Sequence, residues 1–234
     1  METLSKKKVL IIGATGGIGN ELAKLIKSSQ ADLWLSGRND LKLGQLASDL
    51  GLSSSQIFKA DISDPLQVQA MAEWSGNPDI IINLAGIGII KPLEQLSYED
   101  FNRTIDVNLK GTFNILKSYL PGMKVIKQGL IINLPGVLGK VPMAGAAAYA
   151  ASKYGLNGML KSVREELKRT NIRITNLYLG GTDTPFWDQI DLNVQRDKFV
   201  LAKEAAKSIW FLCQQPISGV VSEMVLQPFN HQAI

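Results

Sequence analysis

Two side chains on one predicted helix could transfer a proton. Tyr149 and Lys153 stand four residues apart in the segment A-A-A-Y-A-A-S-K, and residues at this spacing share one face of a helix. Because an ammonium group favours the phenolate, we expect Lys153 to lower the pKa of Tyr149 and make it a usable acid or base. The same spacing is common on solvent-facing helices, so the pair gains meaning only from the rest of the chain.

A glycine-rich turn near the N-terminus could bind a phosphate. Residues 9–12 form a short apolar run that predicts a buried strand, and residues 20–26 predict a helix. Between them lie Gly13, Gly16, Gly17 and Gly19. Glycine has no Cβ to hold a pyrophosphate away, and a helix N-terminus presents N–H groups to an anion. A tight turn without a ligand is the alternative.

The end of the second predicted strand, residues 32–36, indicates which dinucleotide would bind. In dinucleotide-binding folds a carboxylate here accepts from the ribose hydroxyl of NAD, whereas an arginine suits the extra phosphate of NADP. Gly37 stands at the carboxylate position and Arg38 follows it. The sequence therefore predicts NADP(H) in preference to NAD(H), with a surface arginine in a turn as the alternative.

The remaining apolar patterns alternate between strands and helices. Further strands are predicted at residues 56–60, 79–83, 128–134, 171–178 and 220–226. Helices are predicted at residues 40–50, 146–169 and 202–214, and a long helix opens at the capping box of residues 97–100. Asn108 and Gly111 are unfavourable inside that helix, which indicates a special role. The alternation predicts an α/β fold in which residues 1–234 form one doubly wound parallel sheet of about seven strands, with helices on both faces.

Composition excludes several classes of protein. The 234 residues carry a net charge of +4 and include one cysteine, Cys213, and one histidine, His231. The chain therefore predicts no internal disulfide and no His/Cys metal cluster. The mild positive charge is spread over mixed-sign faces, which argues against nucleic acid as a partner. Without a signal peptide or a run of about 20 apolar residues, the sequence predicts a soluble, cytoplasmic protein with no membrane partner.

Over nearly its whole length the chain resembles the short-chain dehydrogenase/reductase family, in its small single-domain branch. The family's T-G-x-x-x-G-x-G motif matches Gly13, Gly17 and Gly19, with Ile12 where threonine is usual. Its N-N-A-G motif is similar to residues 83–86, N-L-A-G. Its adenine-facing aspartate, helix asparagine and Tyr-x-x-x-Lys pair match Asp61, Asn108, Tyr149 and Lys153. After the sixth strand, Leu179 replaces the family's proline, while Gly180, Thr182 and Thr184 fit.

The resemblance implies an NADP(H)-dependent oxidoreductase that transfers a hydride between nicotinamide and a carbonyl or secondary alcohol. It implies that Tyr149 transfers the proton, that Lys153 tunes it and holds the ribose, and that Asn108 positions a water that relays protons. The implied cofactor-binding residues are Gly13, Thr15, Gly17, Ile18, Gly19, Arg38, Asp61, Ile62, Asn83, Ala85, Gly86, Tyr149, Lys153, Gly180, Thr182 and Thr184.

The candidate substrate-lining residues, Val141, Met143, Phe186 and Trp187, are apolar and predict an apolar ketone or alcohol, with ordinary core packing as the alternative. The resemblance also implies a homo-oligomer, a tetramer or a dimer, that pairs the helices of residues 96–119 and 146–169.

One departure concerns the family's catalytic serine, which lies in N-x-S-S-x-x-G thirteen residues before the tyrosine. Here that segment is N-L-P-G-V-L-G, residues 133–139, so Gly136 occupies the serine position. We therefore expect weak turnover with intact cofactor binding, and an NADP(H)-binding sensor or scaffold is the alternative. Gly136→Ser should raise turnover only if the backbone there does not require a positive φ.

Overall fold

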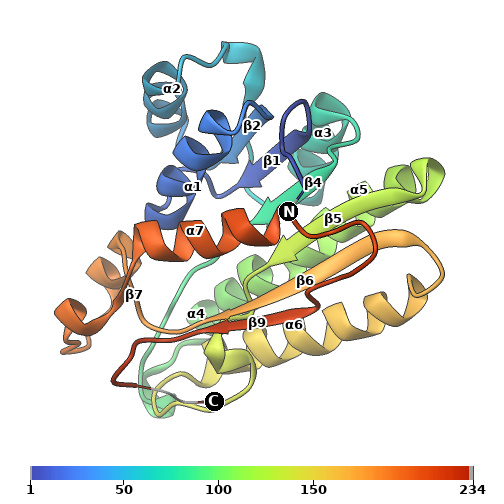
Figure 1. The fold of residues 1–234 in the computed structure, drawn as a ribbon. Helices are drawn as coiled ribbons and strands as arrows, with labels where there is room; N and C mark the ends of the chain where they lie inside the picture. Colours follow the sequence, from blue (N-terminus) through green and yellow to red (C-terminus); the bar gives the residue numbers. More distant parts are fainter. Residues whose placement is uncertain (1, 232–233) are drawn as a thin grey trace.

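The computed structural model describes residues 2–231 and 234, and its centre is a seven-stranded parallel sheet in the order β3-β2-β1-β4-β5-β6-β9 (Figure 1). The order reverses between β1 and β4, so the predicted doubly wound sheet is confirmed. Its strands are β1 (Lys8–Ile12), β2 (Asp32–Gly37), β3 (Ile57–Lys59), β4 (Ile80–Asn83), β5 (Gln128–Asn133), β6 (Asn171–Leu179) and β9 (Glu223–Leu226). A separate short parallel pair consists of β7 (Thr182–Asp183) and β8 (Val200–Leu201).

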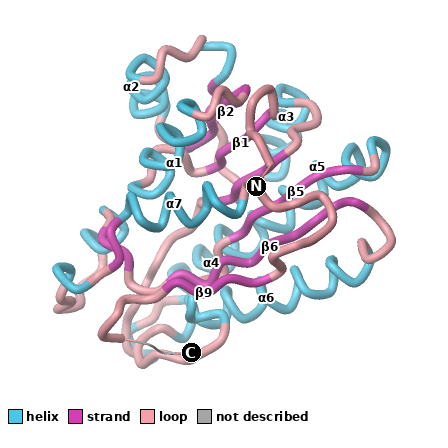
Figure 2. The backbone as a smooth tube through the Cα atoms, in the orientation of Figure 1, coloured by secondary structure: helices cyan, strands magenta, loops and turns pink. Residues whose placement is uncertain are grey.

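Helices cover both faces of this sheet, as the alternation of the chain predicts (Figure 2). One face carries α1 (Gly17–Ser28), α2 (Asp40–Asp49) and α7 (Ala202–Leu212). The other carries α3 (Pro65–Ser75), α5 (Gly111–Ile126) and α6 (Ala147–Glu166), with α4 (Tyr98–Ile105) packed beside α6. No described helix is both long enough and apolar enough to cross a membrane.

The side chains on the two faces of β1 pack into two separate hydrophobic cores. Val9 and Ile11 point to the face of α1 and α7, and Leu10 and Ile12 point to the face of α3, α5 and α6. All four side chains are fully buried or nearly so, which explains why this strand is a continuous apolar run without alternation.

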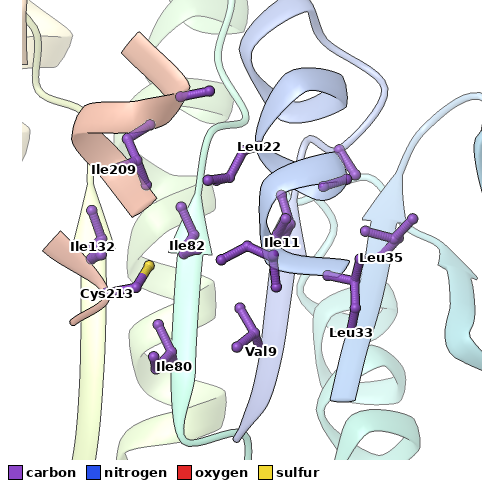
Figure 3. Close-up of a cluster of buried hydrophobic side chains, with 14 of the residues drawn as sticks. Val9, Ile11, Leu22, Leu33, Leu35, Ile80, Ile82, Ile132, Ile209 and Cys213 are labelled. Atoms are coloured by element: carbon purple, nitrogen blue, oxygen red, sulfur yellow. The ribbon is translucent and has the colours of Figure 1, made fainter. Parts of the chain in front are cut away.

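The first core joins the two ends of the chain. α1 and α7 lie side by side over the sheet, and Figure 3 shows Leu22 of α1 and Ile209 of α7 above Ile11, Ile82 and Ile132. At the same contact the indole Nε1 of Trp210 donates a hydrogen bond of 2.8 Å to the hydroxyl of Ser29. Cys213 is buried in this core, as its apolar context predicts.

The long helix predicted from residue 97 onward is present as a helical run without a gap, but its middle is wound as a π-helix and not as an α-helix. Ser97 caps α4 by accepting from the N–H of Asp100 at 3.0 Å, but a π-helical turn, Asp106–Lys110, separates α4 from α5. Such turns widen the backbone and occur often at functional sites, and this one contains Asn108. Two other predicted elements are shorter than expected: α6 ends at Glu166 and β9 begins only at Glu223.

Candidate active site

A cavity of about 740 Å³ opens at the carboxyl edge of the sheet, beside the point where the strand order reverses. This is where open α/β sheets bind their ligands, because the loops after neighbouring strands diverge there. Its walls come from the glycine turn after β1, the loops after β4, β5 and β6, the start of α6 and the segment between β7 and β8.

The glycine turn is shaped by close backbone contacts. Gly13 has φ of +83°, and a Cβ on it would lie 2.7 Å from the amide nitrogen of Ala85. A Cβ on Gly19 would lie 2.5 Å from the carbonyl oxygen of Gly13. Gly16 precedes α1 and supplies no side-chain cap, so the N–H groups of the first helical turn face the cavity at Gly17 and Ile18. These donors and the glycine backbone fit a pyrophosphate.

Tyr149 and Lys153 line the same cavity. The ammonium of Lys153 is 5.5 Å from the centroid of the Tyr149 ring and donates to the carbonyl oxygen of Leu134 at 2.9 Å. Burial lowers the pKa of Lys153 to about 8. Burial also raises the pKa of Tyr149 to about 12, so the expected lowering by Lys153 is wrong for this structure. The reason is that Lys153 is directed to a carbonyl and loss of water dominates around the phenol.

The side chain of Asn108 forms hydrogen bonds to two neighbouring parts of the protein. Its amide nitrogen donates to the carbonyl oxygen of Ile87 at 2.9 Å and to the hydroxyl of Ser152 at 3.1 Å. Its amide oxygen accepts from the N–H of Ile87 at 2.9 Å. Asn108 therefore ties the loop after β4 to the helix that carries Tyr149 and Lys153, and both of its amide hydrogens are used.

The loop after β5 cannot easily carry a serine at position 136. Gly136 has φ of +70° and ψ of 169°, a conformation that is almost confined to glycine. We expect Gly136→Ser to reduce the free energy of unfolding by about 1–3 kcal/mol and to leave turnover low, because the backbone strain displaces the loop. Gly136→Ala is the matched control, since it adds the strain without the hydroxyl. Urea unfolding and turnover with NADPH measure both effects, and a large rise in turnover for the serine variant alone would contradict this expectation.

An aromatic cluster closes the other side of the cavity. The ring centroids of Tyr149 and Phe186 are 6.1 Å apart, those of Phe186 and Trp187 5.5 Å, and those of Trp187 and Phe199 5.1 Å. Phe186 packs against Gly88, where a Cβ would lie 2.3 Å from the ring. These residues make the wall beside Tyr149 predominantly apolar.

A single arginine fastens the segment that carries this cluster. The guanidinium of Arg196 donates to the carboxylates of Asp183 and Asp188 at 2.7 and 2.6 Å and to the carbonyl oxygen of Thr184 at 3.1 Å. Arg196 thus ties the later part of the segment between β7 and β8 to residues 183–188 at its beginning. Phe186 and Trp187, which line the cavity, lie within this fastened stretch.

Comparison with known proteins agrees with this geometry. The sequence matches the short chain dehydrogenase family over residues 7–195. This chain belongs to that family. An uncharacterized oxidoreductase of Staphylococcus saprophyticus is 33% identical over 97% of the chain and 98% of its own length. One from Staphylococcus epidermidis is 30% identical over 97% of the chain and its full length.

Solved structures of other short-chain dehydrogenases have the same fold. A metagenomic short-chain oxidoreductase in complex with NADP is 28% identical, with a TM-score of 0.79 over 97% of this chain and 99% of its own. An alcohol dehydrogenase from the archaeon Thermococcus sibiricus, complexed with 5-hydroxy-NADP, is 25% identical, with a TM-score of 0.83 over 98% of this chain and 100% of its own.

Most of the predicted site residues of this short-chain dehydrogenase line the one cavity. They are Gly13, Thr15, Gly17, Ile18, Gly19, Ala85, Gly86, Val141, Met143, Tyr149, Lys153, Gly180, Thr182, Thr184, Phe186 and Trp187. Arg38, Asp61, Ile62, Asn83 and Asn108 are not among its lining residues.

Those five residues have other contacts. Arg38 forms a loose ion pair of 3.9 Å with Asp61, which also accepts from the hydroxyl of Ser63 at 2.7 Å. Ile62 is buried in the second core, and the Asn83 amide donates to the hydroxyl of Thr112 at 3.0 Å.

Several lining residues are absent from the sequence-based prediction. They include Lys42 on α2, Leu192, Val194 and Phe199 on the segment between β7 and β8, and Gln227 and His231 after β9. Apart from Gln227, none of them belongs to a recognised motif, and only the three-dimensional course of the chain brings them to the cavity.

Proposed function

We propose that residues 1–234 act as one NADP(H)-dependent oxidoreductase unit that interconverts a carbonyl and a secondary alcohol. The observation that carries the proposal is that Tyr149 and Lys153 line the same cavity as the glycine turn. A group with an exchangeable proton is thereby placed in one space with the backbone donors that fit a pyrophosphate. The direct test is NADPH oxidation with a panel of ketones, and NADP+ reduction with the corresponding alcohols.

Each residue of the site then has a defined task. When bound, the nicotinamide supplies the hydride chemistry. Tyr149 donates its phenolic proton to the carbonyl oxygen in the reductive direction and takes a proton back in the oxidative direction. Lys153, freed from the carbonyl of Leu134, holds the ribose and stabilises the phenolate by its charge. Asn108 fixes the loop after β4 through Ile87, and any proton relay at this residue must use its backbone.

Preference for NADP(H) rests on Arg38 at the end of β2. We expect Arg38→Ala to weaken NADPH binding by about tenfold and to leave NADH binding nearly unchanged, because only NADPH carries the phosphate that the guanidinium recognises. Fluorescence titration with both cofactors measures this. An equal loss for both would mean that Arg38 acts only through its ion pair with Asp61.

A homo-oligomer is the proposed assembly. Apolar side chains of the helices that would pair are exposed, including Phe113 of α5 at 49% and Tyr154 of α6 at 44%. Exposed apolar groups on neighbouring helices are typical of subunit contacts. We expect light scattering at micromolar concentration to give the mass of a dimer or tetramer, and a mass of 25.5 kDa would refute the assembly.

The second candidate function is a sensor or scaffold that binds NADP(H) with little turnover. The residue that favours it is Gly136, because the loop after β5 offers no hydroxyl side chain between Asn133 and Tyr149. Tight NADPH binding with no turnover on any of the ketones or alcohols would favour this function over the enzyme.

A further inference from the structure

The cavity has an unusual balance of charge. The described residues that line it include no aspartate and no glutamate, and its basic side chains are Lys42, Lys153 and His231. Asp183 and Asp188 lie on the neighbouring segment, but Arg196 holds both, and neither lines the cavity. Such a cavity favours anions.

The three basic side chains lie at different places along the sheet edge. Lys42 follows β2, Lys153 lies beside Tyr149, and His231 follows β9. In the strand order, β2 and β9 are five interstrand steps apart, which is roughly 24 Å at about 4.8 Å per step. The tail that carries His231 therefore leaves the sheet far from β2, and His231 lines the cavity together with residues of the apolar wall such as Phe186 and Trp187. Figure 1 shows this separation, with the dark red tail and α2 at opposite ends of the molecule.

Specific contacts bring the tail to this place. The N–H of Gly180, after β6, donates to the carbonyl oxygen of Leu226 at 2.8 Å, and a Cβ on Gly180 would lie 2.9 Å from Pro228. The N–H of His231 then donates to the carbonyl oxygen of Pro228 at 3.1 Å and closes a turn. The absence of a side chain at Gly180 thus lets the tail approach the loop that carries Thr182 and Thr184.

The imidazole of His231 is free to meet a ligand. His231 is exposed, and within the part of the chain that the structure describes no hydrogen bond or ion pair engages its ring. Lining residues such as Met143, Leu192 and Val194 are apolar, and Gln227 of the same tail is polar but uncharged. Among the lining residues that the structure describes, His231 is the only side chain besides Lys42 and Lys153 that can carry a positive charge.

We propose that His231 is a specificity-determining residue whose imidazolium binds a carboxylate on an otherwise apolar carbonyl or alcohol substrate. This inference rests on the proposed oxidoreductase function and adds the class of substrate. Histidine changes its charge between about pH 5 and 8, so preference for the acidic substrate should fall as the pH rises through this range. Tyr149, Lys153 and Lys42 are the other titratable groups of the cavity, and the two lysines also favour the acid over its ester, so the part that His231 contributes is the difference between the natural sequence and a variant without the imidazole.

The first experiment uses the fact that the chain has one histidine. Protein without an affinity tag is saturated with NADP+, and the imidazole NMR signal is titrated with pH in the presence of 4-acetylbenzoate or methyl 4-acetylbenzoate. The acid should move the midpoint of the titration upward by about 0.5–1 pH unit, because an anion favours the charged imidazole. The ester should leave it in place. An equal midpoint with both compounds overturns the inference.

The second experiment measures kcat/KM for the acid and the ester with NADPH between pH 5.5 and 8. In the natural sequence the acid-to-ester ratio should fall about tenfold over this range, and in His231→Gln it should be lower and fall much less, because only the lysines then attract the carboxylate. Lys203→Gln removes an exposed charge outside the cavity and should keep the pH-dependent ratio. A ratio with the same pH dependence in His231→Gln overturns the inference while leaving the oxidoreductase proposal intact.

Different experimental results are expected if the oxidoreductase proposal itself is wrong. In that case neither compound is turned over, or NADP+ does not bind, and the NMR midpoint still decides whether His231 meets the carboxylate.

Discussion

Tyr149→Phe should lower turnover by about 100- to 10,000-fold, the usual contribution of a positioned acid or base. NADPH affinity should stay within about twofold, because the ring remains in place against Phe186. Stability should hardly change, since no described group hydrogen-bonds to the Tyr149 hydroxyl. Steady-state kinetics, cofactor titration and thermal unfolding measure these three quantities.

The control for this variant is Tyr154→Phe. Tyr154 lies on the same helix, is largely exposed and does not line the cavity. Removal of the hydroxyl in Tyr154→Phe should leave turnover unchanged. If Tyr149→Phe keeps full turnover, another group supplies the proton, and the assignment of Tyr149 is wrong.

Gly13→Ala should abolish cofactor binding, with an affinity loss of more than about 100-fold for NADPH. The reason is geometric: φ of +83° disfavours a side chain, and the new methyl group would lie 2.7 Å from the amide nitrogen of Ala85. The strain alone costs about 1–3 kcal/mol, and the displaced backbone is the one that would meet the pyrophosphate. Calorimetric titration with NADPH and urea unfolding measure the two losses.

Gly44→Ala is the matched control for this second variant. Gly44 lies on α2, has no atom within 4 Å of its Cβ position and does not line the cavity. Alanine there should raise the free energy of unfolding by about 0.5–1 kcal/mol through its better helix propensity. If Gly13→Ala binds NADPH as tightly as Gly44→Ala does, the glycine turn is not the phosphate site.

The sheet could be predicted from the sequence because its signals are local. Runs such as residues 9–12 and 80–82 are buried on both faces of the sheet, and their apolar composition indicates this burial directly. Asn108 and Gly111 indicate an irregularity in the long helix, but the π-helical winding of this irregularity depends on contacts that the sequence does not reveal. One such contact is between Gly111 and Ile62, whose side chain lies 2.6 Å from the Cβ position of Gly111.

The site was predictable where a motif carries it and not elsewhere. The glycine turn and the Tyr149–Lys153 pair are close in sequence and keep their spacing in space. The positive φ of Gly136 and the shifted pKa of Tyr149 depend on tertiary contacts and on burial, which spacing does not encode. Lys42 and His231 reach the cavity only because β2 and β9 end at the same edge of the sheet.

The contact between α1 and α7 affects how the chain folds during its synthesis on the ribosome. As the protein emerges from the ribosome, β1 and α1 come first, but Ile209 and Leu212, which cover Leu22 and Ile26, come last. Until α7 is made, the part of this apolar surface that α7 covers has no partner, and exposed apolar surface of this kind favours aggregation. Because residues of α1 and α7 share the first core, this core can be completed only after α7 has been synthesised. A chain that is released before α7 leaves the apolar side chains of α1 exposed.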